Sequence, residues 1–344
     1  GNSGALDTFN STLSGWSIIT WVIVLLLYCY FASVLPVWTL LQPRDFINSL
    51  QLLSTIGLVL SGLIAAGIWG VDYINEDTRT SLEIIAPIAR LGENSPEGAP
   101  WIFPFLFITI ACGAISGFHC LVSSGTTSKQ ISSEKDAQFI GYGSMLTEGF
   151  LAILVILACV AGLGLGTNVN GEFFKGQAAY TARYESWGGA AGLSSKIGAF
   201  VDGSANFLKA LGMSSTFAVA LMGVFVASFA ATTLDTACRL QRYVIQELAS
   251  TIKPKKSVLV PFKDKHSATI LAVTLAFLVA ASPTAGADWS WQNAGKGGLN
   301  LWPLFGATNQ LLGGLAFLVI LFWMRRRNIP LWFVAIPAIF MLLL

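Results

Sequence analysis

The apolar residues of this chain are gathered into long runs that alternate with short polar segments. The runs at 16–41, 46–70, 101–128, 212–234, 267–287 and 297–324 contain no Asp, Glu, Lys or Arg, and the run at 137–169 contains only Glu148. A helix needs about 20 apolar residues to cross a hydrocarbon layer about 30 Å thick. With a further run from residue 329, the pattern predicts an all-α, polytopic membrane bundle with about eight transmembrane segments.

The composition supports a membrane protein and gives no sign of a metal or a cofactor. Hydrophobic residues make up 54% of the 344 residues and charged residues 11%, whereas a soluble domain carries about 25% charged residues. Five cysteines, an odd number without a C-x-x-C pair, argue against disulfides and a metal site. A net charge of +2 gives no reason to expect nucleic acid. Without an initiator Met, and ending inside an apolar run, residues 1–344 are expected to form one membrane domain truncated at both ends.

The charged residues predict an orientation in the bilayer. Lys and Arg are concentrated in alternate loops, and such loops stay in the cytoplasm. The segment at 235–266 is therefore expected to be a basic cytoplasmic loop. The long loops at 71–100 and 168–211 are expected outside, with short surface helices. The same rule places the N-terminus of this chain outside.

One apolar run changes character along its length. The stretch ACGAISGFHCLVSSGTTSKQI, residues 111–131, combines three glycines with a cluster of hydroxyl residues. Irregular backbone at membrane depth survives only beside protein or a water-filled cavity, and transporters build binding sites from interrupted helices. The alternative is close helix packing, which small residues also favour. A break after Gly117 would place a helix N-terminus near 121–126, where a substrate carboxylate could bind. The expected substrate-facing residues are Ser116, Gly117, His119, Ser123, Ser124, Thr126 and Thr127.

Two further polar features lie inside apolar runs. Glu148 and His119 are ionisable side chains expected at membrane depth, which makes them candidates for proton coupling. The alternative for each is a packing role with a hydrogen bond to a neighbouring helix. Asn309 and Gln310, in LWPLFGATNQLLGG, are weaker candidates for substrate binding. They are equally consistent with hydrogen bonding between helices.

A second hydroxyl cluster lies in ASFAATTLDTACRLQRY, residues 227–243. Hydroxyl and carbonyl oxygens suit a small cation such as Na⁺, or ordered water. The candidate cation site consists of Ser228, Thr232, Thr233 and Thr236. Asp235 and Arg239 are spaced i, i+4, so a structural ion pair is expected between them at the cytoplasmic end.

Five segments together resemble one family. FASVLPVWTLLQPRDF, PFLFITIACGAISGFHCLVSSGTTSK, GYGSMLTEG, TTLDTACRLQRYVIQE and LWPLFGATNQLL, spread from 31 to 312, are similar to the carbon starvation protein A family. The resemblance implies an inner-membrane transporter of the amino acid–polyamine–organocation superfamily, associated with uptake of peptides or pyruvate and with proton coupling. It also implies an inverted repeat, in which 102–127 is the interrupted first helix of the second half and 228–236 carries sodium-site hydroxyls. Family members have a preceding region, which this chain is expected to lack.

Among the function classes, a secondary transporter explains these features best. We expect no enzyme, because no catalytic motif is recognisable. No G-x-x-x-x-G-K-[ST] loop points to ATP-driven transport, and two histidines are a weak basis for a haem subunit. A channel or a non-transporting sensor remains the alternative. The sequence leaves open whether the substrate is pyruvate, another small carboxylate or a peptide, and whether H⁺ or Na⁺ is the coupling cation.

Overall fold

The computed structural model describes residues 3–71, 79–103, 107–169, 171–184, 186–190, 193–251, 260–284 and 286–343. The chain divides into two compact units, which are described here one at a time. The first unit consists of Gly1–Gln42, Trp101–Gln130 and Thr232–Leu344, and the second of Pro43–Pro100 and Ile131–Ala231. The divisions at 42/43 and 231/232 fall inside the long helices α3 (Val37–Trp69) and α10 (Ser215–Thr251).

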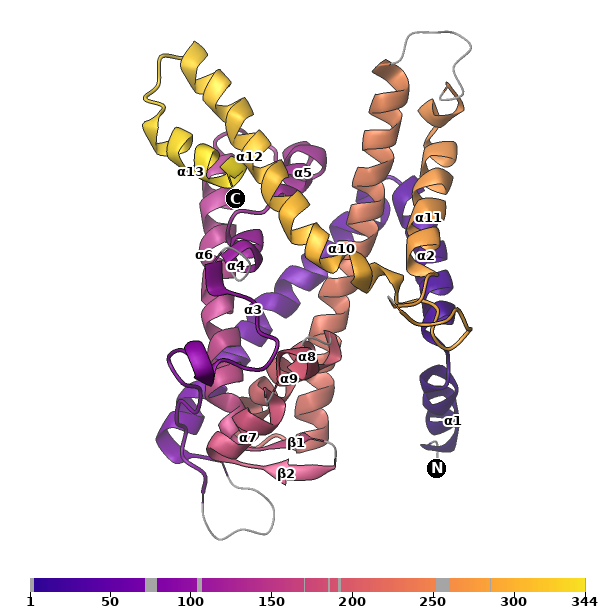
Figure 1. Ribbon diagram of the computed structural model, residues 1–344. Helices are drawn as coiled ribbons and strands as arrows, with labels where there is room; N and C mark the ends of the chain where they lie inside the picture. Colours follow the sequence, from indigo (N-terminus) through magenta and orange to yellow (C-terminus); the bar gives the residue numbers. More distant parts are fainter. Residues whose placement is uncertain are drawn as a thin grey trace. The chain divides into compact units, whose positions relative to one another are not determined.

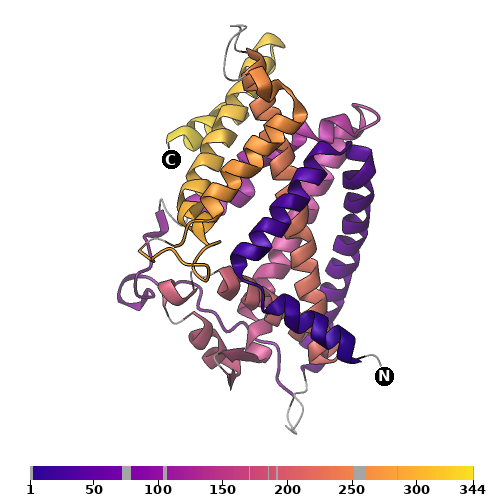
Figure 2. The same ribbon diagram turned by 90° about the vertical axis from the view of Figure 1, so that its right-hand side faces the viewer.

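The first unit is built from helices. Helix α2 packs against α11, and α12 packs against α13, α4 and α5 (Figure 1, Figure 2). The elements are α1 (Ser3–Ser14), α2 (Ile18–Val34), α4 (Phe107–Ala114), α5 (Gly117–Gly125), η3 (Thr127–Lys129), η5 (Val260–Lys263), α11 (Lys265–Ala280), η6 (Gly297–Leu301), α12 (Trp302–Arg326) and α13 (Trp332–Leu343), with the second half of α10.

Local sequence signals fix where several of these helices begin. Ser17 caps α2, and its hydroxyl accepts a hydrogen bond from the backbone N–H of Thr20. Asp264 caps α11, and its carboxylate accepts from the N–H groups of Ser267 and His266. These hydrogen bonds, that of Ser267 first, hold the pKa of Asp264 below its usual value.

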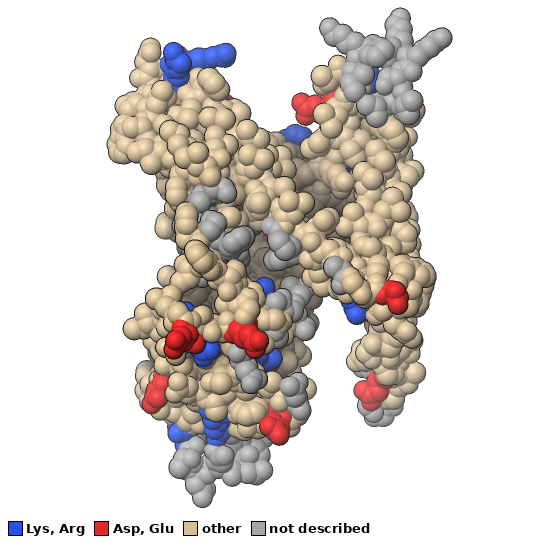
Figure 3. Space-filling model, in the orientation of Figure 1, with Lys and Arg blue, Asp and Glu red and all other residues tan. Residues whose placement is uncertain are grey.

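The second unit is a set of long helices with a folded cap at one end. Its elements are most of α3, α6 (Asp136–Val160), η4 (Gly162–Leu165), the antiparallel strands β1 (Thr167–Val169) and β2 (Glu172–Phe174), η1 (Gly92–Asn94), α7 (Gly176–Arg183), α8 (Trp187–Ala190), α9 (Leu193–Ala210) and the first half of α10. Figure 3 shows charged side chains over the β1, β2 and α7 region, while the visible helix bodies are almost free of charge.

Helix α9 forms the centre of this cap. Gly62 of α3 lies against the backbone of Phe207, and Gly203 of α9 lies against Ala158 of α6, so that a Cβ at either glycine would overlap a neighbouring backbone. Asn206 is buried and donates hydrogen bonds to the carbonyls of Gly162 and Gly166 at 2.8 and 2.7 Å. The expectation of only short surface helices in 168–211 is therefore wrong, because α9 is a buried 18-residue helix.

The predicted all-α membrane architecture is confirmed, but the number of spans is not. Within the described residues, four helices are long and apolar enough to cross a membrane, or five if the bent pair Asp7–Ser14 and Ile18–Val34 is one span. The expected eight was too many because several apolar runs form short or interrupted helices, among them α11 with 16 residues and α13 with 12.

The predicted loops also differ in detail. The segment at 235–266 is not loop throughout, because α10 continues to Thr251 and α11 begins at Lys265. Residues 252–259 of this segment, with its basic cluster at Lys253, lie outside the described residues. The loops at 71–100 and 168–211 do meet each other. Glu97 pairs with Ser186, and Ile85 donates to the carbonyl of Val160 at the end of α6. Which side of the membrane they occupy stays a prediction.

Candidate functional site

The interrupted helix is present, and its break lies before Gly117 rather than after it. Helix α4 ends at Ala114 and α5 begins at Gly117, with Ser116 in an extended conformation as the N-cap. The Ser116 hydroxyl accepts a hydrogen bond from the N–H of His119 at 3.4 Å. The predicted loss of regular helix is thus confirmed, but the new N-terminus is at Gly117 and not near 121–126.

The N-terminus of α5 is closed by helix α12. A Cβ at Gly117 would lie 2.5 Å from the Leu312 Cβ and 2.7 Å from the Gly313 nitrogen, so only glycine permits this approach. Asn309 accepts a hydrogen bond from the N–H of Phe118 at 2.7 Å, and its Nδ2 donates to the Ser116 hydroxyl at 3.0 Å. The protein's own amide therefore binds the N-terminus of α5. For Asn309 the alternative of hydrogen bonding between helices is confirmed.

The remaining hydroxyls of the expected set belong to the other end of α5. Ser123 and Ser124 are exposed, and Ser123 lies one turn from the exposed His119. Thr126 is buried and its hydroxyl donates to the carbonyl of Val122 at 2.8 Å, which is a packing role. Thr127 begins η3. Helix α5 therefore packs closely at its glycines, while His119, Ser123 and Ser124 are exposed.

Gln310 is the most unusual polar side chain of α12. It is 2% exposed, and neither its Nε2 nor its Oε1 has a hydrogen-bond partner within the described part of the chain. Leaving such a group without a partner costs about 1–3 kcal/mol. A buried amide of this kind suits a bound water or a polar ligand.

The proposed cation-site hydroxyls fall on both units, and they are described separately. In the second unit, the Ser228 hydroxyl donates to Gln51 Oε1 at 2.9 Å and to the Phe225 carbonyl at 3.2 Å. In the first unit, the Thr236 hydroxyl donates to Asp235 Oδ1 at 3.4 Å. Thr232 and Thr233 precede it on α10. A shared cation site stays a prediction, and the described residues contain no cluster of three or more His, Cys, Asp or Glu fit for a metal ion.

Asp235 and Arg239 bond to helix α2 in the interior of the first unit. Their exposed fractions are 0% and 2%. The Tyr28 hydroxyl donates to Asp235 Oδ2 at 2.8 Å, and Arg239 Nη2 donates to the carbonyls of Ala32 and Leu35, the latter at 2.9 Å. Helix α10 extends three turns beyond Arg239, so the two residues do not lie at the end of that helix. The expected ion pair between them stays a prediction.

A sequence signal for the Arg239 contact existed and was missed. Residue 36 is a proline, and proline has no N–H to donate to the carbonyl four residues earlier, that of Ala32. That carbonyl needs another donor, and a guanidinium with five N–H groups supplies one. The pattern of an apolar helix ending in Leu-Pro thus indicates a polar partner from elsewhere, without saying which.

Two cationic side chains lie near the ring of Tyr243, one turn beyond Arg239 on α10. Lys129 Nζ lies 4.3 Å and Arg242 Cζ 4.6 Å from the centre of the Tyr243 ring. Arg242 is buried, and its Nε has no hydrogen-bond partner among the described residues. Tertiary contacts therefore bury both Arg239 and Arg242 within α10.

The two predicted proton-coupling residues are exposed, whereas Asp235 is buried. Glu148 is exposed on α6 in the second unit, and His119 is exposed on α5 in the first. Asp235 is the buried carboxyl of a membrane-length helix with a hydroxyl partner. Asp235 is a further candidate for carrying a proton, beside Glu148 and His119.

Known proteins match this chain along nearly its whole length. Residues 5–344 match the family model described as carbon starvation protein CstA. The chain belongs to the carbon starvation protein CstA family. It is 34% identical to the peptide transporter CstA of Escherichia coli (strain K12), with 94% of this chain and 48% of the relative covered.

Other relatives carry two different functional names. Identity is 32% to the peptide transporter CstA of Helicobacter pylori (strain 26695), with 94% of this chain and 47% of the relative covered. It is 30% to the pyruvate/proton symporter BtsT of Escherichia coli (strain K12), with 92% and 48% covered. The chain spans about half the length of these relatives. No solved structure matches it significantly.

Proposed function

We propose that the protein containing this chain is a secondary transporter of the bacterial inner membrane. It takes up a small carboxylate such as pyruvate, or a peptide, during carbon starvation by symport with a cation, H⁺ in the first place. Relatives named peptide transporter and pyruvate/proton symporter support this class. The interrupted helix α4–α5 with its exposed polar side chains is the observation that carries it.

The exposed polar side chains of α5 favour a transport path over simple packing. His119, Ser123 and Ser124 lie exposed on a helix that continues an apolar segment, whereas Gly117 of the same helix packs against α12. Polar side chains at membrane depth face a bundle interior or a water-filled cavity. These three residues, with Gln310, form the proposed substrate-facing set.

The test is uptake by the full-length protein in proteoliposomes. Labelled pyruvate and a labelled dipeptide are compared under an imposed H⁺ gradient, an imposed Na⁺ gradient and no gradient. Accumulation above equilibrium under the H⁺ gradient supports the proposal, and dependence on the Na⁺ gradient would make Na⁺ the coupling cation. Equilibration without accumulation indicates a channel, and no uptake of either substrate indicates a sensor.

Three isosteric substitutions locate the proton carrier. Glu148→Gln, His119→Gln and Asp235→Asn each remove a titratable group and keep a hydrogen-bonding side chain of similar size. Loss of uphill uptake with retained substrate exchange identifies the carrier, since exchange needs no net proton movement. Wild-type accumulation and pH dependence in all three variants would place the proton path elsewhere.

The proposed orientation has its own test. A cysteine at Ser95, in the loop at 71–100, is expected to react with an impermeant maleimide added outside intact cells. A cysteine at Lys263 is expected to be protected until the membrane is opened. Both positions are exposed, so burial does not explain a difference. The reverse labelling pattern would invert the topology.

A further inference from the structure

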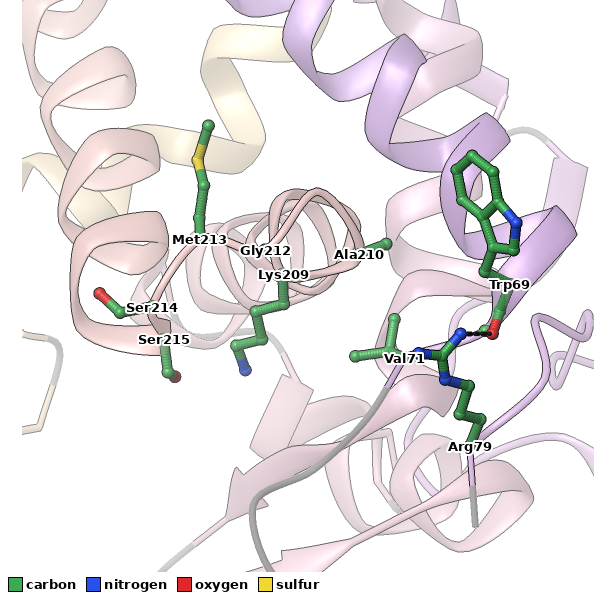
Figure 4. A pocket seen from close by; sticks show the side chains of 10 residues that line it. Trp69, Val71, Arg79, Lys209, Ala210, Gly212, Met213, Ser214 and Ser215 are labelled. Carbon is green, nitrogen blue, oxygen red and sulfur yellow. Dashed lines mark hydrogen bonds between the residues drawn. The ribbon is translucent and has the colours of Figure 1, made fainter. Parts of the chain in front are cut away.

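A cavity of about 710 Å³ opens at the capped end of the second unit (Figure 4). It lies where α3 ends, α9 ends and α10 begins. Trp69 and Val71 line it from the end of α3, and Lys209 lines it from the last turn of α9. Ser214 and Ser215 line it from the start of α10.

Backbone contacts hold the walls of this cavity in place. Gly70 has φ +68°, and a Cβ there would lie 2.7 Å from the Thr80 carbonyl oxygen. Val71 and Thr80 exchange two backbone hydrogen bonds of 3.0 Å. On the opposite side, the N–H of Gly212 donates to the Lys209 carbonyl at 2.8 Å and closes the turn between α9 and α10. The cavity is therefore a built part of the cap.

The charged residues among the described lining residues are basic. They are Lys209 and Arg79. Lys209 Nζ donates to Asn206 Oδ1 at 2.9 Å, and Figure 4 shows the side chain between Ser215 and Val71. Burial lowers the pKa of Lys209, partly opposed by the charge of Asp202. An anion in the cavity would offset the cost of keeping this ammonium group charged.

The start of α10 adds to the positive potential. The carbonyl of Ser214 accepts the first helical hydrogen bond, from Ala218 at 3.0 Å, so the first turn begins at Ser215. The first N–H groups of a helix have no acceptor within it, and the helix dipole places about half a positive charge there. Trp69 and Met213 supply an apolar wall beside these donors. The combination suits a small anion with an apolar part.

We propose that this cavity is a carboxylate-binding site, with Lys209 and the first turn of α10 as donors and Arg79 at the rim. Pyruvate and the C-terminus of a peptide share this group. The site deepens the proposed function, on which it rests, because it would collect the substrate at the loop-bearing face before transport. The chemistry needs no proton transfer and no cofactor.

The test is direct binding to the purified full-length protein by isothermal titration. The probes are pyruvate, alanyl-alanine and alanyl-alanine amide, which lacks the carboxylate. The variants are Lys209→Gln, Lys209→Arg and Lys196→Gln. Lys196 is the matched control, because it lies on the same helix but is exposed and outside the cavity lining.

Lys209→Gln is expected to weaken binding of the carboxylate probes about tenfold or more, as for loss of one charge-assisted hydrogen bond. Lys209→Arg is expected to retain most of the affinity, and Lys196→Gln to stay within about twofold. The amide is expected to bind no better to wild type than to Lys209→Gln. Equal affinities in Lys209→Gln and Lys196→Gln, or binding of the amide as tight as that of the acid, would overturn the site.

Uptake measurements separate this inference from the proposed function. If wild type accumulates pyruvate and Lys209→Gln binds it normally, the site is refuted and transport stands. If wild type accumulates neither substrate but binds carboxylates through Lys209, transport is refuted and the site stands. A melting temperature for each variant shows whether Lys209→Gln is folded, and Lys209→Arg decides the matter if it is not.

Discussion

Two helix N-termini of this protein have the same local chemistry and opposite surroundings. Helix α5 begins after Ser116 and α10 begins at Ser215, so each has a serine at its start and first-turn N–H groups without an acceptor in the helix backbone. At α5 the Asn309 side chain and the backbone of α12 fill the space in front of those groups. At α10 the space is a cavity with Lys209 and Arg79 in its lining.

A glycine near the start of a helix has a different role at each of these two sites. Gly117 precedes the first donors of α5, and its missing side chain admits a neighbouring helix rather than a ligand. Gly212 precedes α10 with φ +86°, and it turns the chain so that the first turn faces a cavity. An N-terminus is available to an anion only where tertiary packing leaves its front open.

The largest expected effect comes from Gly117→Ala. The new Cβ would overlap two backbone atoms and one Cβ of α12, so α12 must shift, at a cost of about 3 kcal/mol in the free energy of unfolding. The melting temperature of the purified full-length protein measures this loss. Gly113→Ala on α4 is the matched control, since nothing lies within 4 Å of its Cβ. Equal melting temperatures for the two variants would contradict a closed α5 N-terminus.

Asn309→Ala is expected to cost about 2 kcal/mol, because the part-buried N–H of Phe118 loses its acceptor and Ser116 loses a donor. Thermal unfolding again gives the measurement. Thr308→Ala is the control, since the Thr308 side chain is exposed and bonds only within its own helix in the contacts described. If the two changes destabilise equally, Asn309 does not cap α5.

The double substitution Ser123→Ala and Ser124→Ala tests the exposed face of α5 directly. We expect the apparent KM for the carboxylate substrate to rise about threefold to tenfold, which corresponds to about 0.6–1.4 kcal/mol of lost hydrogen bonding. Membrane abundance should not change, because both side chains are exposed. Thr126→Val, at the buried C-cap of the same helix, should leave KM unaltered. A KM that moves only in Thr126→Val would contradict a substrate-facing role for the two serines.

The smallest expected effect is on stability at α10. Ser215→Asp places a carboxylate of the protein at the open N-terminus and should raise the free energy of unfolding by about 0.3–1 kcal/mol. It should also abolish pyruvate binding, because the site then resembles the occupied N-terminus of α5. Ser215→Asn has a side chain of the same size without the charge and should retain binding. Undiminished pyruvate affinity in Ser215→Asp would show that the first turn of α10 takes no part in binding.

Much of the fold was predictable from local pattern, and much of the site was not. The charge-free runs correctly indicated membrane helices, and the glycines of 111–131 correctly indicated a broken one. The same runs overstated the number of spans, because hydropathy does not distinguish a crossing helix from a short packed one such as α13. The five quoted motifs led to the right family, while the roles inferred for Ser116, Gly117 and Asn309 changed once their partners were known.

The sequence by itself determined where helices form and where they break. Backbone groups in lipid must be satisfied within their own segment, so apolar length, glycine and proline act locally. Tertiary structure alone decided what each polar group meets. Asn309 reaches α5 across 193 residues, and Arg239 reaches the Ala32 carbonyl across 207. Such partners are chosen by packing between distant segments, and no local pattern around either residue specifies them. For the same reason only the folded cap showed that α9 is buried and that α10 begins at a cationic cavity.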